Sequence, residues 1–530
     1  MSANLSVILQ SENIRKASPE LFQILEELFP VKFASGVMAG SQPLGGILLT
    51  GEQGGGAGVP TVEMPRATAA GNEASLIEAK IVFSDDAEVP FPFRGRALPS
   101  KVAAGFVALK LAAGETALAS IEGQVIWSLR KTGSVRHYRT GLPLPQIPEG
   151  GNFQNLFNGE RFLELLPLVH WLRQLCGENE YQGLPLRAQF MFDDPNLHWP
   201  SYGYVDYREI AARAEKANYH VSFATVPLDN WFTHQPTAKI FRENPRRLSL
   251  LVHGNNHVHQ ELLQNYTPED RVFLLRQALQ RIEQLEAAAK VGVSRAMAAP
   301  HGACSEEMLA ELPKCGFVGA TISHGSLRAH NRSRPWVKSL GYRPAEIIKG
   351  CAVMPRWRLA SNAHNTILLA AYLRQPIILV GHHGDLKAGL ELLDGLAGFI
   401  NSLGTVAWLD TAELAEINYR WRMEDDVFRL QPLGSRVRVK IPNGTKSLIV
   451  DHGGQVGWQT WRVTSAGAAA RSIEAGTIVN LSGATDEELL LEVPVQPSVK
   501  LDEISNRRIF RPFVRRLATE ARDRLVALVR

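Results

Sequence analysis

Apolar and polar positions follow a strand–helix rhythm through the middle of this 530-residue chain. Between residues 186 and 422, short apolar runs such as 186–192 and 248–252 alternate with stretches of helical period. The longest of these covers 267–290, with Thr267 as a candidate N-cap before a proline at the first helical position. Repeated strand–helix units predict an α/β fold with a parallel sheet. Roughly seven or eight units favour a distorted (β/α) barrel.

The flanking regions have other patterns. Residues 1–150 combine short strands with a helix at 19–29, which predicts an N-terminal mixed α/β domain whose role the sequence does not indicate. Residues 151–185 form a linker and a helix with apolar spacing, which we expect to pack on the next domain. Residues 423–500 alternate strands with turns, as in a small β-sandwich accessory domain. Residues 501–530 predict a basic amphipathic C-terminal helix.

Composition narrows the class of protein without naming a function. The chain is 45% hydrophobic and 21% charged with a formal net charge of +4, which does not suggest a nucleic-acid partner. Its four cysteines include no CxxC pair, so neither a disulfide framework nor a cysteine zinc site is expected. We see no secretory signal and no apolar run of membrane-spanning length. A cytoplasmic, multidomain protein is therefore the expectation; the oligomeric state is not indicated.

The C-terminal helix is basic and has an apolar stripe. From residue 507 onward it carries eight arginines against Glu520 and Asp523, a net charge of +6. Two interpretations stay open: the helix makes a peripheral contact with an anionic inner membrane surface, or it docks on its own protein or a partner. The stripe expected to make that contact consists of Phe513, Leu517, Ala521, Leu525 and Leu528.

Polar residues follow the predicted strands of the central region at their C-terminal ends. Asp193 and Asp194 follow the first strand, and His253 and His257 follow a later one. Because the C-terminal ends of parallel strands meet at one edge, these side chains should lie together. Further strand ends carry Pro300, His301, Gly302, His324, His382 and His383.

Two histidines four residues apart suggest a metal site. On a helical turn, His253 and His257 would present both imidazoles on one face, and a neighbouring aspartate would complete a two-histidine, one-carboxylate set. Such a set suits Zn²⁺, with Co²⁺, Ni²⁺ or Fe²⁺ as alternatives. A bound cation lowers the pKa of water toward ~7, and a second aspartate can accept the water proton.

The order of these motifs resembles the polysaccharide deacetylase family, also called NodB homology or carbohydrate esterase 4. The resemblance covers roughly residues 186–420. It implies that Asp193 is the catalytic base and that Asp194, His253 and His257 bind the metal. It further implies that the segment Pro300, His301 and Gly302 lines the substrate groove and offers a backbone N–H to the oxyanion, and that His382 or His383 is the catalytic acid.

The chain departs from the family pattern at several positions. Asp-Asp is followed by Pro-Asn rather than glycine, and Ala298 stands where an arginine normally orients the base. Arg295 and Arg356 are candidate substitutes for that arginine. Arg356-Trp357 also occupies the region of the usual Asp-Trp motif, so the chain is a divergent member by this resemblance. Candidate substrate-binding residues are Asn196, His198, Tyr202, Pro300, His301, Gly302, Arg356 and Trp357.

The expected function is that of a divalent-metal hydrolase that removes an acyl group, most simply N-acetyl, from a carbohydrate or glycan precursor. Three alternatives remain. The barrel could bind or assemble carbohydrate without catalysis, which the missing arginine favours. It could be a glycoside hydrolase with Asp193 as nucleophile. The His257-x-His259 pair could also belong to an amidohydrolase metal site, although it does not follow the first strand as such sites usually do.

Overall fold

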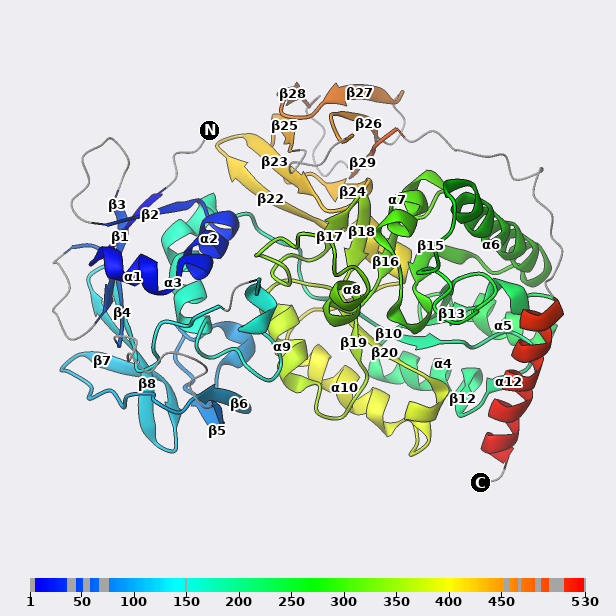
Figure 1. Cartoon of the computed structure of the whole chain (residues 1–530), viewed down its shortest axis with the longest axis horizontal. Helices are drawn as coiled ribbons and strands as arrows, with labels where there is room; N and C mark the ends of the chain where they lie inside the picture. Colours follow the sequence, from blue (N-terminus) through cyan, green and yellow to red (C-terminus); the bar gives the residue numbers. More distant parts are fainter. Residues whose placement is uncertain are drawn as a thin grey trace. The chain divides into compact units, whose positions relative to one another are not determined.

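The chain folds into two compact units (Figure 1), shown by a computed structural model. Unit 1 comprises Met1–Tyr181, Trp336–Arg343 and Asn365–Leu373, and unit 2 comprises Gln182–Pro335, Pro344–His364 and Arg374–Arg530. The structure describes residues 5–35, 44–50, 58–65, 76–147, 150–451, 457–465, 469–481, 488–494 and 510–528.

Unit 1 is built on a nine-stranded mixed sheet in the order β2-β1-β3-β4-β9-β8-β7-β5-β6. Strands β1 to β4 and β9 pair in parallel, and the remaining pairs are antiparallel. The helix expected at 19–29 is α2. The elements are β1 (Leu5–Leu9), α1 (Glu12–Ala17), α2 (Pro19–Leu28), β2 (Val31–Ser35), β3 (Leu44–Thr50), β4 (Thr61–Met64), β5 (Leu76–Phe83), β6 (Ala97–Ala103), β7 (Glu115–Ile121), β8 (Gln124–Thr132), β9 (Val135–Thr140), α3 (Leu166–Cys176) and α9 (His364–Tyr372).

Helix α3 belongs to unit 1, whereas its sequence position suggested packing on the following domain. It contacts β3 and β9, and a side chain at Gly46 would come within 2.7 Å of the Trp171 ring. Glycine at that position lets the indole lie directly on the sheet. The apolar spacing of α3 correctly indicated a buried face but could not indicate which sheet would cover it.

Unit 2 contains a ten-stranded sheet in the order β17-β18-β16-β15-β14-β13-β10-β20-β19, with β21 added beside β10. All pairs are parallel except β17–β18. The mixed α/β class is therefore confirmed. Within the part of the chain that the structure describes, β17 and β19 are the two edge strands of the sheet and do not pair with each other. The barrel is therefore open. The strands are β10 (Arg187–Asp193), β13 (Val221–Thr225), β14 (Leu248–Val252), β15 (Val293–Ala298), β16 (Gly319–Thr321), β17 (Glu346–Ile348), β18 (Cys351–Met354), β19 (Trp357–Arg358), β20 (Ile377–Gly381) and β21 (Ala407–Trp408).

Apolar side chains from neighbouring strands of this sheet form a buried core that includes Met191, Leu251, Ala298, Met354 and Ile378. The connecting helices begin where local signals place them. Thr267 caps α6 by accepting a hydrogen bond from the Asp270 N–H at 3.1 Å. The helices and the short hairpin are β11 (Ser201–Tyr202), β12 (Val205–Asp206), α4 (Tyr207–Ala217), α5 (Gln235–Glu243), α6 (Pro268–Ala289), α7 (Glu306–Lys314), α8 (His324–His330), α10 (Glu391–Asn401), α11 (Thr411–Glu416) and α12 (Phe510–Leu528).

Two four-stranded sheets follow the parallel sheet and share one hydrophobic core. Trp461, Leu430, Val437 and Leu491 in that core are almost fully buried. The first strand begins at Tyr419, a few residues before the expected boundary at 423. One sheet contains β22 (Tyr419–Glu424), β23 (Val427–Pro432), β25 (Ser447–Val450) and β28 (Val479–Asn480), and the other contains β24 (Arg436–Lys440), β29 (Glu488–Glu492), β26 (Thr460–Ser465) and β27 (Arg471–Glu474).

All four cysteines are free and buried. Among the described residues, no helix combines the length and the apolar character needed to cross a bilayer.

Candidate metal centre and catalytic site

The three predicted metal ligands come together at the C-terminal edge of the parallel sheet. Asp194 directly follows β10, and His253 and His257 follow β14, which is separated from β10 by β13 alone. One ligand atom from each residue lies within 4.8 Å of the other two. His257 Nε2 is 3.3 Å from Asp194 Oδ1. Two imidazole nitrogens and a carboxylate oxygen are thus close enough to share one cation.

The loop that holds the histidines is not the helical turn expected from their spacing. Residues 253–261 are irregular, and His257 has φ +52°. Asp194 and His301 also have left-handed backbone conformations, with φ of +86° and +58°. Such conformations cost of order 1–3 kcal/mol each in non-glycine residues and persist only where surrounding contacts hold them. Three residues of the candidate site therefore have backbones that the fold must stabilise.

Glu261 stabilises the backbone at one of these residues, His257. Its buried carboxylate accepts backbone N–H groups from Asn255 at 2.8 Å, Asn256 at 2.7 Å and His257 at 3.2 Å. Arg281, from α6, donates to the side-chain oxygens of both asparagines. Burial raises the pKa of Glu261, while the three N–H groups act in the opposite direction. The loop is thereby closed around a residue that sequence reasoning did not single out.

His253 is oriented by the neighbouring strand. Its Nδ1 lies 2.9 Å from the carbonyl oxygen of Ala298, so Nδ1–H donates to that oxygen and Nε2 is the available ligand atom. Burial lowers the pKa of His253, and burial together with the His253 charge lowers the pKa of His257 to about 2. Both imidazoles are therefore neutral at physiological pH, which is the form that binds metal.

Asp193 is held by Arg356. Arg356 Nη1 lies 3.1 Å from each carboxylate oxygen of Asp193, and Nη2 donates to the carbonyl of Ala299 at 3.0 Å. Both side chains are buried. Ala298, where the family arginine was expected, lies in the apolar core of the sheet. Of the two candidate substitutes, Arg356 contacts the predicted base, and Arg295 pairs with Glu286 instead.

Asp194 is paired with a guanidinium. Burial by itself raises the pKa of this carboxyl, but the charge of Arg516 outweighs burial and holds the pKa well below its usual range. Arg516 Nη1 donates to Asp194 Oδ1 at 3.0 Å, and its other nitrogens bind Asp229. Arg516 and Asp229 were not identified from the sequence, since no local signal links residues so far apart along the chain.

The two candidate acids differ in their surroundings. His382 is exposed and close enough to Asp194 to contribute to lowering its pKa. His383 is partly buried: its ring stacks near Tyr204 and meets the Tyr202 ring edge-on, and its Nε2 is 3.6 Å from Asp523. A side chain at Gly203 would come within 2.2 Å of His383 Nδ1, so the absence of one there leaves room for the imidazole.

The predicted substrate-binding residues fall into two groups. His301 is exposed beside His257, with ring centroids 5.0 Å apart, between the buried Pro300 and Gly302. Trp357 is partly buried at the start of β19. Asn196, His198 and Tyr202, in contrast, are buried against α12. His324 is also buried, at the start of α8, and burial lowers its pKa to about 4.

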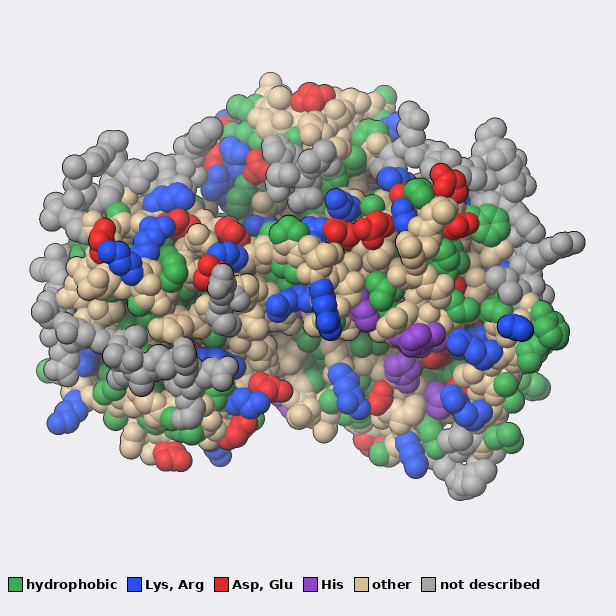
Figure 2. Space-filling view, in the orientation of Figure 1, with side chains coloured by type: hydrophobic (Ala, Val, Ile, Leu, Met, Phe, Trp, Pro, Cys, Tyr) green, Lys and Arg blue, Asp and Glu red, His purple; other side chains and the backbone are tan. Residues whose placement is uncertain are grey.

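The surface around the site is rich in histidine. Figure 2 shows several histidine side chains gathered on unit 2 beside lysine and arginine, and His259, His301 and His382 are the exposed ones near the ligands. His259 does not belong to the cluster that could hold a metal among the described residues.

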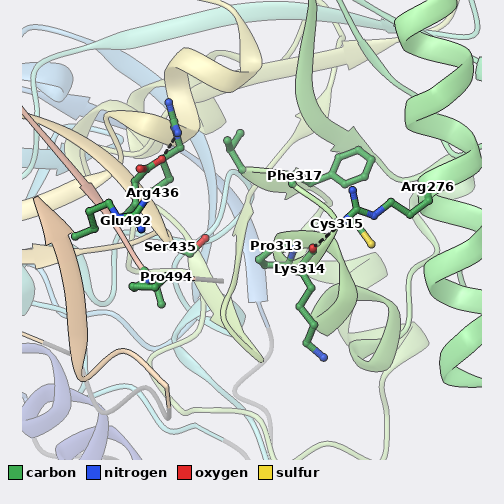
Figure 3. Close-up of a pocket in the computed structure, with 13 residues that line it drawn as sticks. Arg276, Pro313, Lys314, Cys315, Phe317, Ser435, Arg436, Glu492 and Pro494 are labelled. Carbon is green, nitrogen blue, oxygen red and sulfur yellow. Dashed lines mark hydrogen bonds and ion pairs between the residues drawn. The ribbon is translucent and has the colours of Figure 1, made fainter. Parts of the chain in front are cut away.

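A separate cavity of about 510 Å³ lies between α7 and the C-terminal sheets (Figure 3). Its Arg436 pairs with Glu416 and Glu492, and none of the predicted site residues lines it. The candidate chemistry of the chain therefore lies at the strand ends and not in this cavity.

Comparisons with known proteins give only remote matches to solved structures. No family model matches it, and no curated protein does. The crystal structure of Agd3, a novel carbohydrate deacetylase, is 11% identical with a TM-score of 0.48, over 93% of this chain and 99% of that one. A family 4 carbohydrate esterase from Streptomyces lividans is 8% identical with a TM-score of 0.25, over 41% and 86%. The T48 deacetylase is 13% identical with a TM-score of 0.26, over 44% and 90%.

These solved structures are named as deacetylases or as a carbohydrate esterase, the family that the motifs of this chain resemble. The residues of the site, and not this likeness, carry the function proposed for the chain.

Replacing Arg356 tests the buried pair with Asp193. Arg356→Ala leaves a buried carboxylate without its partner, so the free energy of unfolding should fall by about 3–5 kcal/mol. Arg295→Ala is the matched control, because its partner Glu286 is partly exposed and that pair should contribute only about 0–1 kcal/mol. Urea denaturation of both variants measures the difference. Equal effects of the two substitutions would show that Asp193 does not depend on Arg356.

Proposed function

We propose that the chain is a divalent-metal-dependent hydrolase that removes an acyl group, most simply N-acetyl, from a carbohydrate. The observation that carries this proposal is the convergence of Asp194, His253 and His257 within 4.8 Å, with Asp193 held beside them by Arg356. Each of the four residues stands in the order of the deacetylase motifs and at the strand end where that order requires it.

The donor atoms fit a divalent cation of the zinc type. Two neutral imidazoles and one carboxylate form the set that Zn²⁺ uses in catalytic sites, where further positions stay open to water and substrate. Co²⁺, Ni²⁺ and Fe²⁺ accept the same ligands. The hydrogen bond from His253 to Ala298 is the kind of supporting contact that fixes the orientation of a ligating imidazole.

Such a cation would polarise the acyl carbonyl and make the attacking water more acidic. The chain supplies the remaining functions. Asp193, oriented through both carboxylate oxygens by Arg356, accepts the proton of the water. A backbone N–H of the segment at His301 donates to the oxyanion that develops on the carbonyl oxygen. His301 has φ +58°, and its ring lies 5.0 Å from the ring of His257.

His382 is proposed as the acid that protonates the leaving amine nitrogen. It is exposed and close enough to Asp194 to contribute to the low pKa of that carboxyl. His383 is confined between two tyrosine rings and Asp523, which leaves its imidazole less free to reach a bound substrate. Proton delivery to the leaving group is what a positioned histidine contributes in this kind of reaction.

Arg356 also bears on the non-catalytic alternative. That alternative gained its support from the arginine missing at Ala298. With a guanidinium bound to Asp193 from another strand end, the orientation that the arginine would provide is present. A carbohydrate substrate is proposed because the order of the motifs around Asp193, Asp194, His253 and His257 resembles that of a carbohydrate-directed family.

Metal binding provides the direct test. Wild-type protein should bind about one Zn²⁺ per chain and release acetate from N-acetylated oligosaccharides, and His253→Ala should lose most of the bound metal because one of three ligands is gone. His259→Ala is the control, since His259 is exposed and outside the cluster. Elemental analysis and acetate assay give the two readouts. A wild-type protein that takes up no metal even when it is added would overturn the proposal.

Separate substitutions of the two neighbouring histidines identify the acid. His382→Ala should reduce kcat by roughly 10²-fold or more with little change in metal content, since general acid catalysis contributes 10²–10⁴-fold. His383→Ala should reduce kcat by less than about tenfold on the same principle. Steady-state kinetics with metal content measured in parallel distinguishes loss of the acid from loss of the cation. The reverse order of effects would assign the acid to His383.

A further inference from the structure

Helix α12 faces the protein with the opposite side from that expected of an amphipathic helix. Its charged residues Arg516, Glu520 and Asp523 are 3%, 8% and 5% exposed. Phe510 and Leu525, which are apolar, are 78% and 61% exposed. Surface helices normally bury the apolar stripe. The outward apolar side of α12 (red in Figure 1) therefore needs an explanation of its own.

The buried side is held by charge. Arg516, Glu520 and Asp523 are spaced four and three residues apart, so they share one face. Arg516 binds Asp229 through two nitrogens, and Glu520 accepts from Asn196 at 3.1 Å and pairs with His198 at 2.9 Å.

The exposed side is apolar and cationic. Phe510, Val514, Leu517 and Leu525 follow a helical spacing along it. These four, which share Leu517 and Leu525 with the set predicted from the sequence, are called the apolar stripe from here on. Arg511 and Arg515 are exposed on α12 as well, whereas the exposed Arg522 pairs with Asp523 at 2.6 Å, and between residues 510 and 525 both acidic residues are buried. The exposed side therefore carries positive charge without negative charge.

Aromatic side chains of unit 2 extend the apolar stripe. Trp231, Phe232 and Trp199 are 43%, 46% and 55% exposed. The Trp231 ring lies 6.1 Å from the Phe513 ring of α12, and the Arg524 guanidinium is 6.0 Å from the Trp199 ring. Exposed tryptophans beside arginines and an apolar helix face are the composition of surfaces that lie at the boundary of lipid headgroups and acyl chains.

We propose that the apolar stripe of α12, together with Trp199, Trp231 and Phe232, docks on an anionic lipid bilayer. The helix lies in the plane of the interface with its charged side still bound to the protein. An anionic membrane fits better than a protein partner because the face combines only positive charge with aromatic groups, and because lipid requires no matching pattern of donors and acceptors.

Vesicle co-sedimentation of the full-length chain tests this docking. Wild type should bind vesicles of phosphatidylcholine with phosphatidylglycerol at least tenfold more than phosphatidylcholine alone, and Leu517→Glu/Leu525→Glu should lose at least nine-tenths of that binding. Val107→Glu/Ile478→Glu is the control, since it adds the same charge at exposed apolar positions outside the face. No binding of wild type, or equal loss in the control, would overturn the proposal. So would a wild-type dimer in sedimentation velocity that the α12 variant abolishes, because a second copy would then cover the face.

The buried side of α12 independently carries a second inference, which rests on the proposed function. Asn196, His198 and Tyr202, all predicted to bind substrate, are 1%, 3% and 0% exposed, and each bonds to Glu520 or Asp523. Arg516 occupies the carboxylate oxygen of Asp194 that lies 3.3 Å from His257. We infer that α12 is an internal cap: it covers the substrate residues and holds a metal ligand, and it must move for substrate to bind.

Loosening the cap without touching the ligands tests this inference. In the full chain, Glu520→Gln/Asp523→Asn should lower KM severalfold, tighten Zn²⁺ binding and speed hydrogen exchange across residues 196–202. Arg511→Ala, an exposed substitution on the same helix, should change none of these. Raised KM or weaker metal binding in the double variant would show that α12 is a permanent wall of the site. If neither wild type nor the double variant binds Zn²⁺, the proposed function fails. In that case the rate of hydrogen exchange across residues 196–202 still tests the cap, and an unchanged rate would overturn it.

Discussion

Two adjacent carboxylates at the end of a central strand, Asp193 and Asp194, impose the main constraint on unit 2. Both are largely shielded from water, and buried charges are tolerated only when they are paired or neutralised. The fold answers with a different partner for each. Arg356, directly before β19, binds Asp193, and Arg516, from the last helix, binds Asp194. The arrangement of strand ends, loops and terminal helix follows from supplying these partners.

The two partners differ in what they leave available. Arg356 binds both oxygens of Asp193 and a backbone carbonyl, so it fixes a base in place and does not compete with a ligand. Arg516 instead donates to the one carboxylate that must bind metal in the proposed site. A guanidinium and a divalent cation compensate the same negative charge, so they are alternatives at Asp194 as far as electrostatics is concerned. The adjacent Asp229 gives Arg516 a second anion to bind.

Sequence reasoning could predict that Asp194, His253 and His257 lie close together because the rule behind it is topological. Parallel strands end at one edge, so polar residues after β10 and β14 had to be neighbours whatever the details of the loops. The N-cap Thr267 could be predicted in the same way, because a helix N-cap is determined by a few adjacent residues. The backbone conformation at His257 could not be predicted from the sequence. The four-residue spacing suggests a helical turn, whereas Glu261 holds an irregular loop by accepting three backbone N–H groups.

The C-terminal helix shows where such reasoning reaches its limit. Its sequence predicts that the apolar face makes the contact, either with an anionic membrane surface or with its own protein or a partner, because burial of apolar surface usually stabilises a helix. The partners of α12 are buried polar groups more than 280 residues earlier in the chain, such as Asp229 and His198, and no local pattern reveals them. The buried carboxylates of Asp229, Asp194 and Glu520 are each paired across the contact between α12 and the rest of unit 2. These pairs set the orientation of the helix, so its apolar side faces outward.

This mode of attachment has an energetic consequence. Apart from Pro512 and the half-buried Phe513, the described contacts of α12 with unit 2 are mainly hydrogen bonds and ion pairs. Ion pairs near a surface contribute little each, whereas the buried pair of Arg516 and Asp229 costs several kcal/mol to break by removing one partner. The helix is therefore held by the Arg516 pair together with the buried contacts of Glu520 to Asn196 and His198. Any ligand that offers Asp194 and Asp229 other compensation removes the contribution of Arg516, which ties the state of the site to the position of the helix.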